Sequence, residues 1–305
     1  MGKIKIFRHN DMDGAGCSIV VNNKFGLDNV DHEICSVNDV NEKVSQFFET
    51  GDYENYDIIY ISDISVNEEV AEKINKDIEE GNYKLELYDH HKTAEWLNKY
   101  SWAKVIIKNE NGIKESGTSL LYYELLESNT NKTINISIEI LIEGIRAYDT
   151  WDWKEHGSKF PKQLQDIYGI VGDEEFVNFY SKNYLYDLMP EIFLQLIKYK
   201  RIDIDNYIKE KLEKVVIKNE DNYNIAVVLC DRKDCFSELG SKIVENEQIN
   251  YAMLIYDGGV ALRSKLDFDV SVIAKKYGGG GHKNAAGFKY DKWYRWLGDW
   301  IGDKI

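Results

Sequence analysis

The chain of 305 residues is 43% hydrophobic and contains only two prolines, which indicates a globular protein of two domains. Its 53 acidic and 38 basic residues give a formal net charge of −15, which opposes long-range attraction to duplex nucleic acid. The sequence has no uncharged apolar run of about 18 residues and no signal-peptide core after Met1. We therefore expect a cytoplasmic protein that makes no contact with a membrane.

The acidity is uneven along the chain. Residues 219–305 hold 12 basic and 13 acidic residues, whereas residues 1–218 hold the other 26 basic and 40 acidic residues. An anionic partner would therefore meet the C-terminal part more readily, unless bound cations neutralise a site in the N-terminal part.

Strands and helices are predicted to alternate along the first half of the chain. We expect strands over residues 3–8, 32–37, 56–61 and 85–88, and helices over 15–21, 40–48 and 67–78. A strand at 102–107 and helices at 116–126 and 138–147 follow. This alternation predicts right-handed βαβ units, and therefore an α/β fold with a doubly wound parallel sheet.

Groups that bind metal or move protons follow three of these strands. They are His9, Asp11 and Asp13 after the first strand, Asp63 after the third, and Asp89, His90 and His91 after the fourth. Each group alone has a plainer interpretation: a capped turn for the first, the N-cap of helix 67–78 for the second, and a solvated turn for the third. Because parallel strands bring their carboxyl ends to one edge, we expect the three groups to converge on one crevice.

A further candidate ligand, Asp149, ends the predicted helix at 138–147. Its neighbour Asp152 is a weaker candidate, and we expect Trp151 and Trp153 to serve packing. Mixed His and carboxylate ligands suit Mn²⁺ better than Ca²⁺, which prefers oxygen alone, or structural Zn²⁺, which favours sulfur.

The second half of the chain begins with a charge-rich helical stretch over residues 161–218, whose part at 191–217 is interpreted as a connector. Strands are predicted at 223–229, 251–256 and 260–263, with helices at 237–244 and 270–277. The run Gly278 to Gly281, followed by His282, is either a flexible linker or a backbone cradle for a phosphate. The basic residues between Arg263 and Lys289 favour phosphate binding.

In this order the motifs resemble those of the DHH phosphoesterase superfamily with a C-terminal DHHA1-type domain. The resemblance covers nearly the whole chain and is closest to the branch of NrnB-type oligoribonucleases, or nanoRNases. It implies a metal-binding catalytic domain at residues 1–190, a helical connector at 191–218 and a substrate-binding domain at 219–305, with the active site in the cleft between the domains. It also implies two Mn²⁺ ions, with Mg²⁺ or Co²⁺ as alternatives.

Roles for individual residues are implied by the same resemblance. Asp63 would bridge the two metal ions, His9 and Asp11 would complete the ligands of one ion, and Asp13, His90 and Asp149 those of the other. Asp89 would orient a ligand, and His91 would contact the scissile phosphate. The residues implied in binding the substrate from the second domain are Arg263, Ser264, Gly279, Gly280, Gly281 and His282.

The sequence thus predicts a hydrolase that cleaves short oligoribonucleotides by attack of a hydroxide that bridges two metal ions. The alternatives are a 3′-phosphoadenosine-5′-phosphate phosphatase, a cyclic or linear dinucleotide phosphodiesterase, a RecJ-like exonuclease for single-stranded DNA, a pyrophosphatase and, outside the enzymes, a nucleotide-binding sensor. The near-neutral second domain argues against binding of long strands. The sequence leaves a homodimer open.

Overall fold

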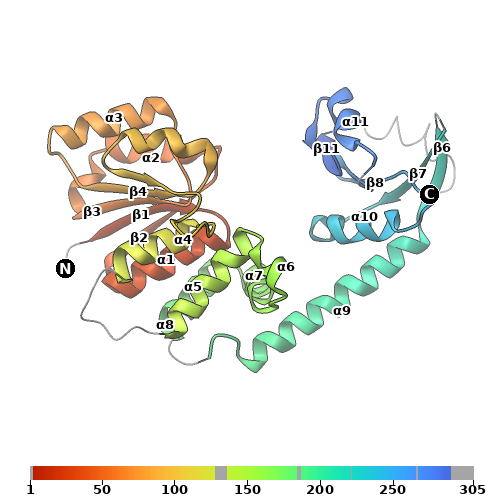
Figure 1. The fold of residues 1–305 in the computed structure, drawn as a ribbon, viewed down its shortest axis with the longest axis horizontal. Coiled ribbons are helices and arrows are strands. Elements are labelled where there is room, and N and C mark those ends of the chain that lie inside the picture. The colour runs from red at the N-terminus through yellow and green to blue at the C-terminus, as the bar shows by residue number, and fades with distance from the viewer. Residues whose placement is uncertain (1–2, 128–135, 184–186, 221, 266, 290–305) are drawn as a thin grey trace. The chain divides into compact units, whose positions relative to one another are not determined.

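The computed structural model describes residues 3–127, 136–183, 187–220, 222–265 and 267–289. The chain divides into two compact units, Met1–Ile197 and Lys198–Ile305. The elements of each unit are labelled in Figure 1. Residues 221, 266 and 290–305 of the predicted second domain lie outside the described residues. No helix within these ranges has the length and apolar character needed to cross a bilayer.

The first unit is built on a five-stranded parallel sheet. Its strands are β1 (Ile4–His9), β2 (Val30–Cys35), β3 (Ile58–Ser62), β4 (Leu85–Asp89) and β5 (Ala103–Val105), in the order β2-β1-β3-β4-β5. Strand β1 pairs in parallel with both β2 and β3, so the strand order reverses between β1 and β3. Open sheets of this kind bind their ligands at such a switch point, outside the carboxyl ends of the strands.

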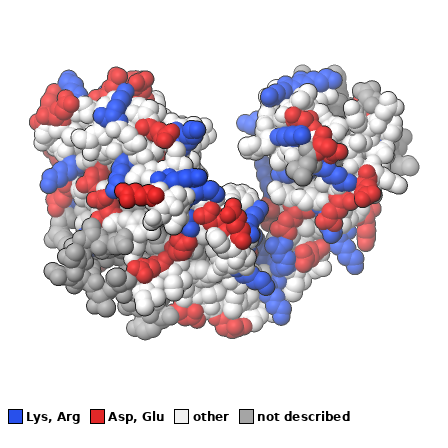
Figure 2. All heavy atoms as spheres, viewed as in Figure 1, with Lys and Arg blue, Asp and Glu red and all other residues white. Residues whose placement is uncertain are grey.

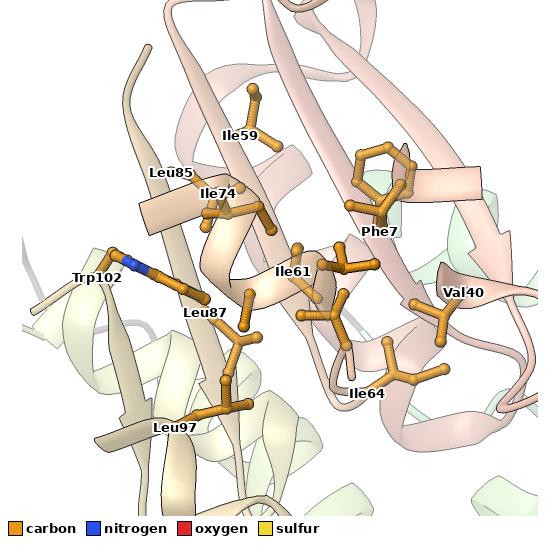
Figure 3. Close-up of a cluster of buried hydrophobic side chains, with 14 of the residues drawn as sticks. Phe7, Val40, Ile59, Ile61, Ile64, Ile74, Leu85, Leu87, Leu97 and Trp102 are labelled. Atoms are coloured by element: carbon orange, nitrogen blue, oxygen red, sulfur yellow. The ribbon is translucent and has the colours of Figure 1, made fainter. Parts of the chain in front are cut away.

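Helices cover both faces of this sheet (Figure 1). One face carries α2 (Val40–Glu49), α3 (Glu68–Glu79) and the 3₁₀ helix η3 (Lys92–Lys99), and the other carries α1 (Met12–Phe25), α4 (Gly117–Tyr122) and α5 (Ile136–Asp149). Successive strand residues point to opposite faces, so Ile59 and Ile61 join the first core while Tyr60 joins the second. Figure 3 shows the first core, in which Leu87 packs near Ile74 and Leu97. The predicted doubly wound α/β fold is confirmed.

Three further helices of the first unit lie beside α1 and α5. They are α6 (Asp152–His156), α7 (Phe160–Val171) and α8 (Asp173–Asn183). Leu164, Phe176 and Tyr180 from α7 and α8 pack with Ile19 and Ile145 in a third core. Short 3₁₀ helices lie at η1 (Leu27–Asn29) and η2 (Asp52–Asn55), and α4 continues into a single π-helical segment, Tyr123–Glu127.

The second unit contains a six-stranded mixed sheet in the order β10-β11-β9-β8-β7-β6. Its strands are β6 (Val216–Glu220), β7 (Tyr223–Leu229), β8 (Tyr251–Tyr256), β9 (Gly259–Ser264), β10 (Gly280–His282) and β11 (Ala285–Lys289). Helices α10 (Phe236–Val244) and α11 (Val270–Lys276) pack on it, with the short η5 (Lys233–Cys235) before α10. The long helix α9 (Glu191–Glu213) runs from the first unit into the second.

The structure corrects one sequence interpretation and excludes one of the two alternatives for the glycine run. The connector predicted at 191–218 is helical only to Glu213, because Val216–Lys218 pair with β7 as part of the edge strand β6. The glycine run is not a flexible linker. Gly280 and Gly281 form strand β10, which pairs with β11 in an antiparallel hairpin.

Candidate active site

The carboxyl ends of β1, β3 and β4 bring the predicted ligands together. His9 Nδ1 lies 2.7 Å from Asp11 Oδ2 and 3.8 Å from Asp63 Oδ2. His90 Nε2 lies 3.2 Å from the other oxygen, Asp63 Oδ1. Residues as far as 81 positions apart in the chain therefore meet at the one edge where the parallel sheet places them.

Two groups of three ligands share this edge. His9, Asp11 and Asp63 form one group, in which one ligand atom from each residue lies within 4.8 Å of the others. The second group is Asp13, His90 and Asp149, in which His90 Nε2 lies 3.7 Å from Asp13 Oδ2 and 3.5 Å from Asp149 Oδ2. Since His90 also lies beside Asp63, the two groups adjoin at Asp63.

Asp63 has the most unusual environment in the cluster. It is 2% exposed, its backbone is left-handed with φ of 60°, and Oδ2 has no hydrogen-bond partner among the described residues. The N-cap interpretation of this residue is wrong, because the Asn67 side chain accepts from Val70 N–H and caps α3. A buried carboxylate oxygen without a partner is costly, and a cation bound there would satisfy it.

Asp13 is held by the start of α4. Its two carboxylate oxygens accept from the backbone N–H groups of Gly117 at 2.6 Å and Thr118 at 3.1 Å. An ideal Cβ on Gly117 would lie 2.4 Å from Asp63 Cβ, so only glycine allows α4 to approach this closely. Sequence analysis identified the helix start at Ser116 but not these contacts, because no local pattern links residues 13 and 117.

Asp89 positions the histidines beside it. Its Oδ1 accepts from the backbone N–H groups of His90 and His91 and lies 2.7 Å from His91 Nδ1, while Ser65 Oγ donates to Oδ2. Asp89 also belongs to a third possible ligand group with Asp63, His90 and His91. Because hydrogen bonds already occupy both of its oxygens, Asp89 is better suited to orienting His91 than to binding a cation. Ser65 was not predicted from sequence.

The electrostatics of the cluster favour bound cations. Burial, followed by the charges of Asp13 and Asp11, raises the pKa of Asp63 well above its ordinary value. The same causes raise the pKa of Asp149 to about 7. Burial opposes ionisation of Asp11 as well, but its hydrogen bonds with His9 and with the backbone N–H of Gly14, together with the charge of His9, outweigh this and lower the pKa of Asp11 to about 2. Positive charge among these carboxylates would relieve their repulsion, so the donor set fits divalent metal ions.

The residues after Asp149 have structural roles. Asp152 Oδ2 lies 2.8 Å from Arg146 Nη1, and Asp152 Oδ1 lies 3.2 Å from Lys114 Nζ, so these cations engage the weaker candidate ligand. The packing role predicted for Trp151 is wrong, because its side chain is 61% exposed with Lys154 Nζ 3.9 Å from the ring centroid. Trp153 stacks on Tyr148, as expected for packing.

The second unit aligns two of its predicted substrate residues. Arg263 on β9 pairs with Ala285 on β11, which pairs with His282 on β10. Directly paired residues project to the same face of a sheet, and strands lie about 4.8 Å apart, so Arg263 and His282 flank the small Ala285 at about 10 Å separation. The absence of a Cβ at Gly240 leaves room for the Arg263 side chain, which sequence analysis did not predict.

The other predicted substrate residues have mixed roles. Ser264 Oγ donates to Phe268 O and accepts from Asn284 Nδ2, so its hydroxyl stabilises the loop. A Cβ on Gly279 would lie 2.1 Å from Gly287 O, and one on Gly281 2.5 Å from Ala286 Cα. These two glycines therefore permit close packing against β11, whereas Gly280 adjoins open space where a ligand can approach its backbone.

Comparison with known proteins places this arrangement in a family. No family model matches the chain. The chain is 35% identical over 293 residues to oligoribonuclease NrnB of Bacillus subtilis (strain 168), a match that covers 92% of the chain and 71% of NrnB. The chain belongs to the NrnB family. The resemblance to NrnB-type oligoribonucleases is thereby confirmed.

Solved structures share the architecture of this chain at low sequence identity. Exonuclease RecJ bound to manganese aligns over 95% of this chain and 86% of its own, with a TM-score of 0.55 and 14% identity. A pGpG-specific phosphodiesterase, PggH from Vibrio cholerae, aligns over 94% and 92% with a TM-score of 0.50 and 12% identity. At these identities the likeness concerns the fold alone.

Proposed function

We propose that the chain is a metal-dependent phosphodiesterase that hydrolyses short oligoribonucleotides. The observation that carries this proposal is the pair of three-ligand groups that adjoin at the buried, unsatisfied Asp63. The 35% identity to oligoribonuclease NrnB supports the substrate class. On the face drawn in Figure 2, Lys and Arg side chains are interspersed with Asp and Glu.

In the proposed mechanism, His9 and Asp11 would help hold one cation, Asp13, His90 and Asp149 would help hold the other, and Asp63, which lies beside both groups, would serve both. When bound, two divalent cations, proposed to be Mn²⁺, activate the attacking water and stabilise charge on the phosphate. The hydrogen bond from His91 to Asp89 raises the pKa of His91, which favours a protonated ring able to donate to a phosphate oxygen. Arg263, His282 and the backbone at Gly280 bind a substrate phosphate in the second unit.

The proposal is tested with RNA of two to five nucleotides, 3′-phosphoadenosine 5′-phosphate, a cyclic dinucleotide and long single-stranded DNA, each with Mn²⁺. We expect the highest kcat/KM for the short RNA, complete loss of turnover with a chelator, and recovery when Mn²⁺ is restored. Preference for the bisphosphate or for long DNA would contradict the substrate class, and turnover that survives chelation would contradict the metal mechanism.

The role of the second unit is tested by His282→Ala. His282 is exposed, so the variant should fold, raise KM for short RNA and keep the wild-type metal stoichiometry. His156→Ala, which removes another exposed histidine, is the control and should leave KM unchanged. Loss of bound metal in the His282 variant would contradict a role confined to the substrate.

A further inference from the structure

A cavity of about 680 Å³ lies beside the cluster of proposed metal ligands within the first unit. His9 and Asp63 line it, and so does His91. Its remaining walls are formed by the segments that follow β2, β3 and β4, including Val37 and Trp96. Pockets for small organic ligands measure ~300–1,000 Å³, so this cavity can hold a group considerably larger than a phosphate.

The wall on the β4 side combines an aromatic ring with a cation. Trp96 on η3 is partly buried against the core beneath it, which fixes the indole in place. Lys99 Nζ lies 5.2 Å from the Trp96 ring centroid and 3.1 Å from Glu68 Oε1, so the ammonium group is anchored beside the ring. A rigid aromatic side chain near a positive charge is the combination that binds a base together with its phosphate.

The walls on the β2 and β3 sides add apolar surface and hydrogen-bond donors. Val37 is 71% exposed, and although single exposed apolar residues are common, this one lines the cavity. The side-chain oxygens of Asn41 and Asn67 accept from the backbone N–H groups of Asn67 and Val70. Their NH₂ groups have no acceptor within the described part of the chain, so each can donate to a ligand.

We propose that this cavity is a nucleoside subsite, which takes the nucleoside joined to the scissile phosphate. The base lies against Trp96 and Val37, and the amides of Asn41 and Asn67 donate to its ring or carbonyl acceptors or to the ribose hydroxyls. Every base offers a π-face and acceptors, so the subsite accepts nucleosides without strict base preference. This inference rests on the proposed hydrolysis of oligonucleotides, because His91 connects the cavity to the phosphate.

The direct test is binding of adenosine 3′- and 5′-monophosphate and of ribose 5-phosphate, measured by calorimetry on the Mn²⁺-loaded protein. The wild type should bind at least one adenosine monophosphate more tightly than ribose 5-phosphate. Trp96→Ala should weaken that binding by about tenfold, the usual effect of removing one stacking ring, and leave ribose 5-phosphate unaffected. Trp96→Phe keeps an aromatic face and should retain most of the affinity. Equal weakening for both ligands, or none for the nucleotide, would overturn the subsite.

Because Trp96 also packs on the core, a second pair of variants avoids it. Val37→Asp places a negative charge in the cavity at a 71% exposed position and should lower kcat/KM for a diribonucleotide by about tenfold, since the charge repels the phosphate. The matched control is Ile136→Asp, at 68% exposure in the same unit and outside the cavity lining, which should leave kcat/KM unchanged. Equal effects of the two substitutions would overturn the inference. Absence of dinucleotide hydrolysis by the wild type would instead refute the proposed function.

Discussion

The backbone N–H of Gly117 donates a 2.6 Å hydrogen bond to Asp13 Oδ2, although the residues are 104 positions apart. This contact joins the start of α4 to the start of α1. It also brings Gly117 against Asp63, where an added Cβ would lie 2.4 Å from Asp63 Cβ. One glycine therefore fixes the distance between two carboxylates that belong to different ligand groups.

The first prediction concerns this glycine. Gly117→Ala should displace Asp63, lower kcat about 10–100-fold as loss of a ligand's support typically does, and destabilise the fold by about 1–3 kcal/mol. Steady-state kinetics and urea unfolding measure the two effects. The control is Gly112→Ala, where the added methyl group meets open space. Because φ at residue 112 is +77°, this substitution should lower the free energy of unfolding by about 1 kcal/mol, but it should leave kcat unchanged. A fully active Gly117→Ala variant would show that the spacing is not required.

Asp63→Asn should separate stability from activity. Asparagine tolerates the left-handed backbone at residue 63 and removes the repelling charge, so the metal-free variant should melt at a higher temperature than the metal-free wild type. Turnover should fall more than about 100-fold. Losing a residue that only orients a metal ligand already lowers activity about 10–100-fold, and losing a ligand itself should lower it further. Asp57→Asn, at an exposed carboxylate before β3, should change neither quantity. Retained Mn²⁺-dependent turnover would remove Asp63 from the metal site.

Removing one partner of the buried ion pair between Arg8 and Asp173 should destabilise the fold strongly. Arg8 is 2% exposed, and its Nη1 lies 2.8 Å from Asp173 Oδ1. Asp173→Ala leaves a buried guanidinium without its carboxylate, so unfolding should require about 3–5 kcal/mol less free energy. Glu69→Ala breaks the exposed pair with Lys73 and should cost less than about 1 kcal/mol. Similar losses in urea titrations of the two variants would show that Arg8 finds another partner.

His32 should make stability depend on pH. Burial, reinforced by the charge of Arg8, lowers the pKa of His32 to about 4, below its ordinary 6.5, so the unfolded chain binds the proton more readily. The stabilisation is complete above about pH 6.5 and declines as the pH falls towards 4, by up to about 3 kcal/mol. His32→Gln keeps polar contact with Ser18 and Asn22 and should lack this decline. Parallel curves for the two proteins between pH 7 and 4.5 would exclude His32 as the cause.

The sequence predicted the features that depend on local pattern. Apolar runs followed by Asp or His indicated the strand ends that carry His9, Asp63 and His90. Because the carboxyl ends of parallel strands lie at the same edge of the sheet, these residues were expected to lie close together. The bond between Gly117 and Asp13 was not predictable, since it joins distant segments through backbone groups. Sequence analysis missed the exposure of Trp151. This residue is the N-cap of α6 and has a left-handed backbone with φ of 67°, a conformation that the sequence pattern did not indicate.

The proposed ligands are spread from His9 to Asp149, and this distribution bears on biosynthesis. Domains fold as units while the ribosome extends the chain from its N-terminus. A nascent chain that has emerged only to β5 carries the first-group ligands but lacks Asp149 and the α4 amides that hold Asp13. With the proposed ligands, full metal loading would await release of α5, and nuclease chemistry would be delayed until the chain has emerged through Asp149.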